Sequence, residues 1–214
     1  MEAEAPLRRG WVEPALRTEF SGLGIAVAEV AAQSRRSPAG VKQRLKHLSD
    51  ITHGGRALAQ RREPIASAYR IFFRQIGIDP EDIRPPAEAA MLERMRAGRF
   101  KSRNTVDDAI TVALVETGVY VRAFDAAQVQ GDLGLRVSVP GERLGGDGLE
   151  LPGGTLVIAD EQRAIGLIFG DTAPGRGVSP DTRRMALGAV QVPGVPDISV
   201  EEAMWICSDI LTSS

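Results

Sequence analysis

Asn104 and Asp107 are the residues whose types and spacing most directly suggest a binding role. They stand at the start of an apolar pattern of helical period, where Asn suits the N-cap and an acidic residue suits the third helical position. That structural role alone explains both residues. Alternatively, this helix start borders a pocket, in which backbone N–H groups and the Asn104 amide hold a carbonyl or ester oxygen. The sequence leaves both interpretations open.

Two glycine–aspartate pairs offer a second kind of chemistry. Gly131-Asp132 precedes an apolar run and Gly170-Asp171 follows one, positions at which such pairs commonly form turns. Glycine also lets a ligand approach the backbone closely, and the neighbouring carboxylate can take up a substrate ammonium group. Each pair is therefore either a turn or part of the lining of an amino-acid site.

Standard catalytic and metal-binding signatures are absent from the sequence. It contains no GxxxxGK[ST], GxGxxG, HExxH or GxSxG motif. His47 and His53 are the two histidines, and neither has a partner at a spacing typical of a metal site. Cys207 is the single cysteine, which excludes an intramolecular disulfide. We therefore expect no metal and no cofactor.

Length and charge set the outer limits. The chain has 214 residues, 43% of them hydrophobic, which is enough to bury a core as one domain. A formal net charge of −2 argues against DNA binding through a strongly basic surface. The first residues lack the features of a signal peptide, and no window approaches the roughly 20 apolar residues of a membrane span. We expect a cytoplasmic protein with no membrane association.

Basic residues nevertheless gather between Ser34 and Arg62. A solvated helical face is the simpler explanation for such a run. The alternative is a surface that docks an RNA backbone, for which the candidate contacts are Arg35, Arg36, Lys42 and Arg44.

Helical patterns dominate the first part of the chain after an apolar strand over residues 24–30. Ser37 is expected to cap a helix that begins at Pro38, and further helices are expected from Pro64 to Gly77, from Pro86 to Gly98 and from Asn104 to Gly118. A last helix is expected to start at Ser199, with Glu202 completing a capping box.

Strand patterns dominate from residue 119 onward. Short apolar runs separated by Gly- and Pro-rich loops predict strands over 119–123, 133–139, 155–159, 164–169 and 186–191. Helices gathered first and strands gathered later indicate an α+β fold, with helices packed on a largely antiparallel β core. We expect residues 1–16 to form an N-terminal extension and residues 17–214 to form a single domain.

The order of several short motifs resembles a known family. Gly77-Ile78-Asp79-Pro80, Arg84-Pro85-x-x-Glu88-Ala89, Ser102-Arg103-Asn104-x-x-Asp107, Phe124-Asp125, Gly131-Asp132-Leu133-x-Leu135-Arg136, Phe169-Gly170-Asp171 and Thr182 follow one another between Tyr69 and Val192. This series resembles the B3/B4 domain, the tRNA-editing module of the phenylalanyl-tRNA synthetase β subunit, here in a free-standing form. The resemblance covers about Arg17 to Val192.

The resemblance implies a function in the fidelity of translation. It implies a deacylase that acts in trans on the aminoacylated 3′ end of a mischarged tRNA, with the amino acid held among the strand ends. Asp171 and Thr182 are then the catalytic candidates, which position water or substrate, and the substrate-binding candidates are Asn104, Asp107, Gly131 and Asp132.

Two alternatives remain at this stage. One is a non-catalytic module that binds tRNA ends, free amino acids or a protein partner, which would explain why no histidine lies between Gly54 and Ser214. The other is hydrolysis of a small aminoacyl ester or amide unrelated to tRNA. The sequence does not reveal which amino acid is recognised or the oligomeric state.

Overall fold

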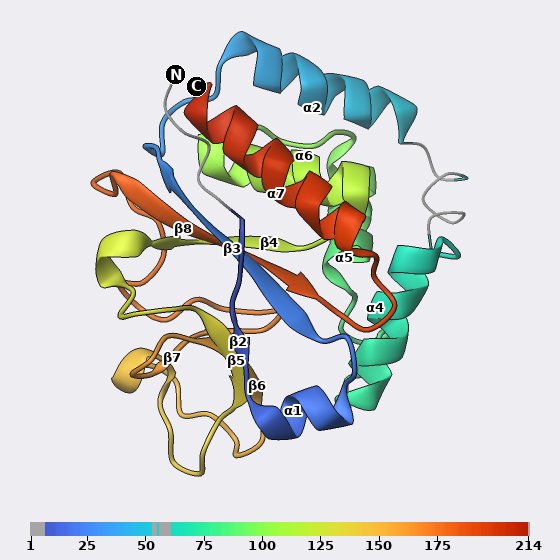
Figure 1. Cartoon of the computed structure of the whole chain (residues 1–214). Helices are drawn as coiled ribbons and strands as arrows, with labels where there is room; N and C mark the ends of the chain where they lie inside the picture. Colours follow the sequence, from blue (N-terminus) through green and yellow to red (C-terminus); the bar gives the residue numbers. More distant parts are fainter. Residues whose placement is uncertain (1–6, 53–54, 56–60, 214) are drawn as a thin grey trace.

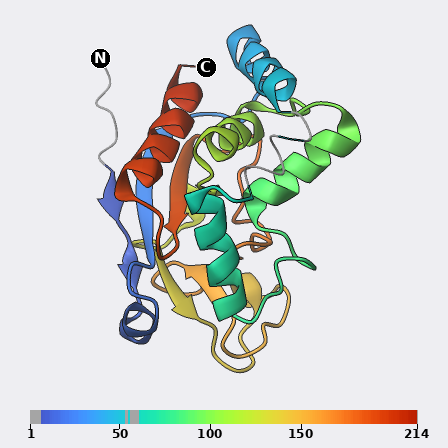
Figure 2. The same ribbon diagram turned by 90° about the vertical axis from the view of Figure 1, so that its right-hand side faces the viewer.

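The computed structural model describes residues 7–52, 55 and 61–213, and the statements below concern these residues. Two four-stranded sheets lie against each other, and helices cover the outer face of the larger sheet (Figures 1 and 2). This arrangement confirms the α+β fold with a largely antiparallel β core.

The larger sheet has the strand order β1-β3-β8-β4, and every neighbouring pair is antiparallel. Its strands are β1 (Arg8–Arg9), β3 (Gly24–Ala31), β8 (Arg184–Gln191) and β4 (Val121–Asp125). The long central pair joins β3 to β8 over their full length, from Gly24 opposite Gln191 to Ala31 opposite Arg184. Almost every residue of β8 is buried, because one face meets the helices and the other meets the second sheet.

The smaller sheet has the order β2-β5-β6-β7. Its strands are β2 (Trp11–Val12), β5 (Gly134–Val137), β6 (Leu156–Ala159) and β7 (Ala164–Leu167). β2 pairs in parallel with β5, and the other pairs are antiparallel. Side chains of both sheets, among them Ile25, Leu135 and Ile165, lie in one continuous hydrophobic core.

The helices are α1 (Pro14–Glu19), α2 (Ala39–Ile51), α4 (Pro64–Gln75), α5 (Pro86–Ala97), α6 (Thr105–Thr117) and α7 (Asp197–Thr212). In Figure 1, α7 crosses β3 and β8, and α6 lies behind it and leads into β4. Among the described residues, no helix is both long and apolar enough to cross a bilayer.

The first described strands connect the two sheets. β1 belongs to the larger sheet and β2 to the smaller one, with only Gly10 between them. A Cβ at Gly10 would lie 2.3 Å from the carbonyl oxygen of Leu133, so only glycine fits where the chain crosses. The predicted division after residue 16 falls within α1, and it stays a prediction.

Most helix boundaries agree with the sequence, but two predicted N-caps are wrong. The hydroxyl of Ser37 donates to the carboxylate of Asp108 and caps nothing, and α2 starts at Ala39. α7 starts at Asp197 after Pro196, so Ser199 and Glu202 lie inside the helix and form no capping box. β4 also begins two residues later than expected and extends to Asp125.

Candidate functional site

The start of α6 is built around Asn104. Its side-chain Oδ1 accepts hydrogen bonds from the backbone N–H groups of Val106 and Asp107, at 3.0 and 2.9 Å. Its Nδ2 donates to Oδ2 of Asp107 at 2.9 Å. This is an N-cap with a reciprocal contact to the third helical residue, so the structural interpretation of the pair is confirmed. The cap takes up both functional groups of the Asn104 amide.

Asp108, which was not among the predicted site residues, is the most buried carboxylate at this helix start, with 1% of its surface exposed. It accepts hydrogen bonds from the hydroxyls of Ser37 and Ser102, both at 2.6 Å, and from the backbone N–H of Arg103 at 2.9 Å. A buried carboxylate requires such donors. Asp108 therefore fixes the loop before α6 and the chain that leads into α2.

Thr182 is also buried, with 2% of its surface exposed. Its hydroxyl donates to Oδ2 of Asp125 at 2.7 Å and accepts from the backbone N–H of Ser179 at 3.0 Å. The other oxygen of Asp125 accepts from the backbone N–H of Ala127. Thr182 thus orients Asp125, a residue that belongs to the motif series but was not among the predicted site residues.

Asp171 lies in the turn after β7, and its side chain is exposed. Its backbone oxygen accepts from the N–H of Leu167 at 2.9 Å. Arg122 of β4 holds the turn from the inside, because its guanidinium donates to the Leu167 oxygen and to the Thr172 hydroxyl. Arg122 is 6% exposed and lies against the rings of Tyr120 and Phe124. The turn therefore presents the Asp171 carboxylate outward from a fixed base.

Gly131 and Asp132 lie at the start of the smaller sheet, and both are exposed. Gly131 has a φ of +76°, and a Cβ there would lie 2.2 Å from the carboxyl carbon of Glu161. Asp132 accepts a 2.9 Å hydrogen bond from Arg8, and its backbone oxygen accepts from the Trp11 indole. The turn interpretation accounts for both residues.

An apolar pocket of about 540 Å³ lies beside the Asp171 turn. It opens between α1, the end of α4 and the smaller sheet, and Phe20, Leu167 and Phe169 are among its walls. Phe169 stacks on Phe73 with ring centroids 4.9 Å apart, which fixes its position. Glu19 is the one charged residue among those that line it. Such a pocket suits an apolar side chain with a cationic group at its edge.

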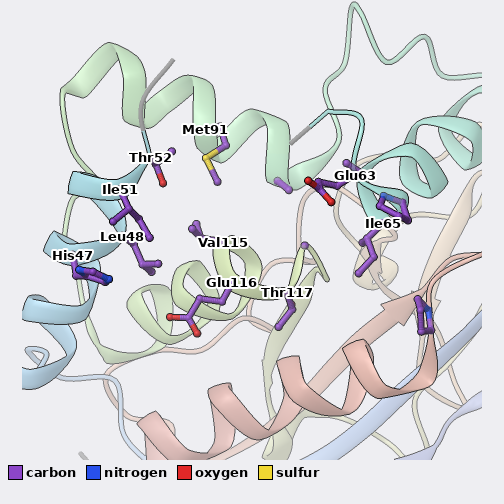
Figure 3. A pocket seen from close by; sticks show the side chains of 15 residues that line it. His47, Leu48, Ile51, Thr52, Glu63, Ile65, Met91, Val115, Glu116 and Thr117 are labelled. Atoms are coloured by element: carbon purple, nitrogen blue, oxygen red, sulfur yellow. The ribbon is translucent and has the colours of Figure 1, made fainter. Parts of the chain in front are cut away.

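A larger pocket of about 700 Å³ lies among α2, α4, α5 and α6 (Figure 3). Leu48, Ile65 and Met91 contribute apolar surface, whereas His47 and Glu116 are polar residues on its α2 and α6 sides. The chain between its lining residues Thr52 and Glu63 includes positions 53, 54 and 56–60, which lie outside the described residues. His53 also lies outside the described residues.

The predicted RNA contacts lie at the α2 side of the molecule. Arg35 exchanges two hydrogen bonds with Thr105: its backbone N–H donates to the Thr105 hydroxyl, and its carbonyl accepts from the Thr105 N–H. The side chains of Arg35 and Arg36 are exposed, whereas Lys42 is half-buried. Arg44 donates to both oxygens of Glu116, and this pairing raises the pKa of the guanidinium. Glu116 therefore compensates the charge of Arg44.

The structure brings some predicted residues together and separates others. The Thr105 hydroxyl donates to the carbonyl of Gln33, and the Ala32 N–H donates to the carbonyl of Arg183, so Asn104 and Thr182 lie at the same end of the larger sheet. Within the described part of the chain, no hydrogen bond joins Asn104 or Asp107 to the Gly131-Asp132 turn. That turn lies beside β1, at the edge opposite β4. The proposed roles of these residues stay predictions.

Comparison with known proteins gives the family. The chain is 32% identical over 109 residues to a protein named phenylalanine–tRNA ligase beta subunit from Pseudomonas savastanoi pv. phaseolicola, covering 50% of this chain and 14% of that protein. It is 33% identical over 102 residues to the protein of the same name from Vibrio cholerae, covering 45% of this chain and 13% of that protein. The chain thus matches a small part of these relatives. The model of the B3/4 domain matches residues 68–195, more than half of the chain, and this protein therefore belongs to the B3/4 domain family.

Proposed function

We propose that this protein is an aminoacyl-tRNA deacylase that hydrolyses mischarged tRNA in trans. The observation that carries the proposal is the B3/4 match over residues 68–195, a span that contains all six candidate catalytic and substrate-binding residues. Relatives that share this region are named as subunits of a phenylalanine–tRNA ligase. The similarity to these relatives supports a tRNA-related role for this chain. Hydrolysis of mischarged tRNA is the specific activity that we propose.

The chemistry required is modest. Water attacks the ester carbonyl, the tetrahedral intermediate collapses, and the ribose hydroxyl leaves with a proton. Because an aminoacyl ester is already activated, positioning of the water and stabilisation of the oxyanion can supply much of the rate enhancement. A strongly basic side chain is not obligatory.

The apolar pocket beside Asp171 supports an assignment of roles. Its aromatic walls, Phe20 and Phe169, suit an apolar amino-acid side chain. The exposed Asp171 carboxylate is available to bind the substrate ammonium group or to orient water. Thr182 is buried and acts through Asp125 as a positioning residue. In the proposal, Asn104 and Asp107 contact the substrate at the end of the larger sheet that carries Thr182, and Gly131 and Asp132 contact a separate part of it beside β1.

One observation favours the alternative, a non-catalytic module that binds tRNA ends or amino acids. The hydroxyl of Thr182 and the amide of Asn104 are both taken up by hydrogen bonds within the protein. A residue whose polar groups are committed in this way holds structure and does not need to touch a substrate. Binding without turnover would then be the activity of the domain.

The decisive experiment measures release of labelled amino acid from correctly and incorrectly charged tRNAs, with and without the purified protein. The proposal predicts accelerated release from selected mischarged species. Asp171→Asn is expected to slow this release roughly tenfold or more, because a carboxylate that orients the reacting groups is lost.

Asp181→Asn is the matched control, since Asp181 is another exposed loop carboxylate outside the Asp171 turn. Thermal unfolding of both variants checks that they stay folded. If a folded wild-type protein accelerates release from no charged tRNA but still binds tRNA, the deacylase assignment is wrong and the binding module replaces it.

A further inference from the structure

A small polar pocket lies between the end of α5 and the start of α6, and it shares no lining residue with the pockets described above. We call it the α5–α6 pocket, and its volume is about 80 Å³. It is lined by Ala90, Glu93, Arg94, Arg99, Phe100, Lys101, Arg103, Asp107 and Thr111. The space suits a few water molecules or one group of the size of a phosphate, and it is far below the several hundred Å³ of a site for a whole cofactor.

Positive charge exceeds negative charge around this pocket. Four of the lining residues are basic and two are acidic, which leaves a formal excess of two positive charges. Glu93 pairs with Arg103 at 3.2 Å, and Asp107 accepts from the Asn104 amide. No ion pair to another described residue is formed by Arg99 or Lys101, and both are exposed. The side chains that remain free to bind a ligand, Arg99 and Lys101, are therefore both positively charged.

Arg94 supplies a second, independent feature. One end of its guanidinium donates to the backbone oxygen of Ser49 at 2.6 Å. Its Nε is buried and has no hydrogen-bond partner, which distinguishes it from the other buried side-chain N and O atoms of the described residues. A buried N–H donor without an acceptor is costly. A small turn of the Arg94 side chain toward the adjoining pocket would bring this N–H to an anion oxygen, which would accept a charge-assisted hydrogen bond.

The helix dipole of α6 does not by itself create this site. Asn104 already accepts from the first free N–H groups of the helix, and Asp107 and Asp108 place negative charge there. Attraction of an anion therefore depends on the basic side chains. The loop that carries Arg99, Lys101 and Arg103 is held in place, because the Phe100 N–H donates to the Ser49 hydroxyl and the Arg103 N–H donates to Asp108.

The basic surface continues beyond the pocket toward α2. Thr105, the first residue of α6 after the loop that carries Arg99, Lys101 and Arg103, exchanges two hydrogen bonds with Arg35. Arg35 and Arg36, which the sequence indicated as RNA contacts, thus lie beside the same helix start. We propose that the α5–α6 pocket is a binding site for a phosphate group, which, on the proposed function, is a backbone phosphate of the tRNA.

The first test uses inorganic phosphate and does not depend on the proposed function. The ¹⁵N–¹H signal of Arg94 Nε is identified by its disappearance in Arg94→Lys. Phosphate at millimolar concentration is expected to shift this signal saturably in the wild-type protein. The shift should need more phosphate in Arg99→Ala/Lys101→Ala, and the same titration with chloride separates specific binding from ionic strength.

The second test uses uncharged tRNA and measures affinity as a function of salt. Loss of one phosphate contact lowers the slope of log K against log salt by about 0.7 to 0.9. Arg99→Ala/Lys101→Ala is therefore expected to reduce this slope measurably. Arg17→Ala/Arg74→Ala is the matched control, because it removes two exposed arginines from α1 and α4, and it should change the slope less.

The possible outcomes test separately whether the phosphate site exists and whether its ligand is the tRNA. If phosphate leaves the Arg94 signal unmoved and both double variants bind tRNA alike, the site does not exist. A phosphate shift without any effect on tRNA binding supports a site for free phosphate and removes the RNA as its source. If tRNA binding depends on Arg99 and Lys101 while no charged tRNA is hydrolysed, the pocket stands and the deacylase proposal fails.

Discussion

The hydroxyl of Thr182 donates a 2.7 Å hydrogen bond to the carboxylate of Asp125, a residue 57 positions earlier in the chain. The bond joins the loop before β8 to the end of β4, and it is reinforced by the N–H of Asp125, which donates to the carbonyl of Arg176. The loop before β8 is thereby fixed at two points to the end of β4, at one end of the larger sheet. Thr182, Asp125 and the Arg176 carbonyl at this end of the sheet are therefore joined by hydrogen bonds.

Thr182→Val tests the contribution of that bond to stability. Valine has a similar shape but no hydroxyl, so Oδ2 of Asp125 and the N–H of Ser179 lose their partner. We expect the free energy of unfolding to fall by about 1–2 kcal/mol, measured by urea denaturation. Thr18→Val, at an exposed threonine of α1, is the control and should change stability by less than about 0.5 kcal/mol. Equal effects of the two changes would contradict the role given to Thr182.

Two substitutions of Asn104 distinguish a role as helix cap from a role in substrate binding. Asn104→Ala removes the acceptor for two backbone N–H groups and is expected to cost about 1 kcal/mol of stability. Asn104→Ser restores a good N-cap but lacks the amide, so it should recover most of that loss. If the serine variant is stable yet releases amino acid from charged tRNA more slowly, the amide contributes to binding. If it is unchanged in both measurements, Asn104 is a cap and nothing more.

Gly131→Ala tests why a glycine stands in the turn before β5. Alanine would have to keep the positive φ of this turn, which a Cβ disfavours, and its Cβ would meet only the end of the exposed Glu161 side chain, which can turn away. Gly175, which has a φ of +71° and open space where a Cβ would lie, is the control for strain alone. We therefore expect Gly131→Ala and Gly175→Ala to destabilise by similar amounts, about 1–2 kcal/mol each, in chemical denaturation. Adding Glu161→Ala should change this loss little, and a marked recovery would show that contact with Glu161, and not the positive φ, is its cause.

Glu142 gives the stability a dependence on pH. Its hydrogen bonds from the Arg136 guanidinium, together with the N–H groups of Val139 and Ala164, lower the pKa of its carboxyl from the ordinary 4.5. A lowered folded-state pKa contributes stability that is present above pH 4.5 and is lost as the pH falls through the folded-state value.

Glu142→Gln should therefore destabilise by about 1 kcal/mol at neutral pH, and less as the medium becomes acidic. Unfolding free energies of wild type and variant across this range give the comparison. Glu150→Gln, at an exposed glutamate, serves as control. A difference between wild type and Glu142→Gln that stays constant with pH would refute the linkage.

Elements whose causes are local could be predicted from the sequence. The start of α6 at Asn104 and its end at Gly118 depend on hydrogen bonds and dihedral angles within a few residues. The ends of α4 and α5 follow the same logic, as do the apolar runs that became β3 and β8. The succession of motifs likewise identified the family that the B3/4 match shows.

Residues with distant partners could not be predicted in this way. Ser37 has the right type for an N-cap, but its hydroxyl binds Asp108, 71 residues away, because a buried carboxylate needs donors more than the exposed start of α2 does. The importance of Asp108 and Arg122 was missed for the same reason, since only packing showed that both are buried.

The sequence alone determined the helices with local caps, the apolar strands and the kind of residues available for chemistry. The tertiary structure decided which of those residues meet. Pairing of β3, β8 and β4 brings the neighbourhoods of Asn104 and Thr182 to one end of the larger sheet, while Gly131-Asp132 lies at its opposite edge beside β1. The positions of these residues relative to one another depend on strand order and register, which arise from contacts between segments far apart in the chain.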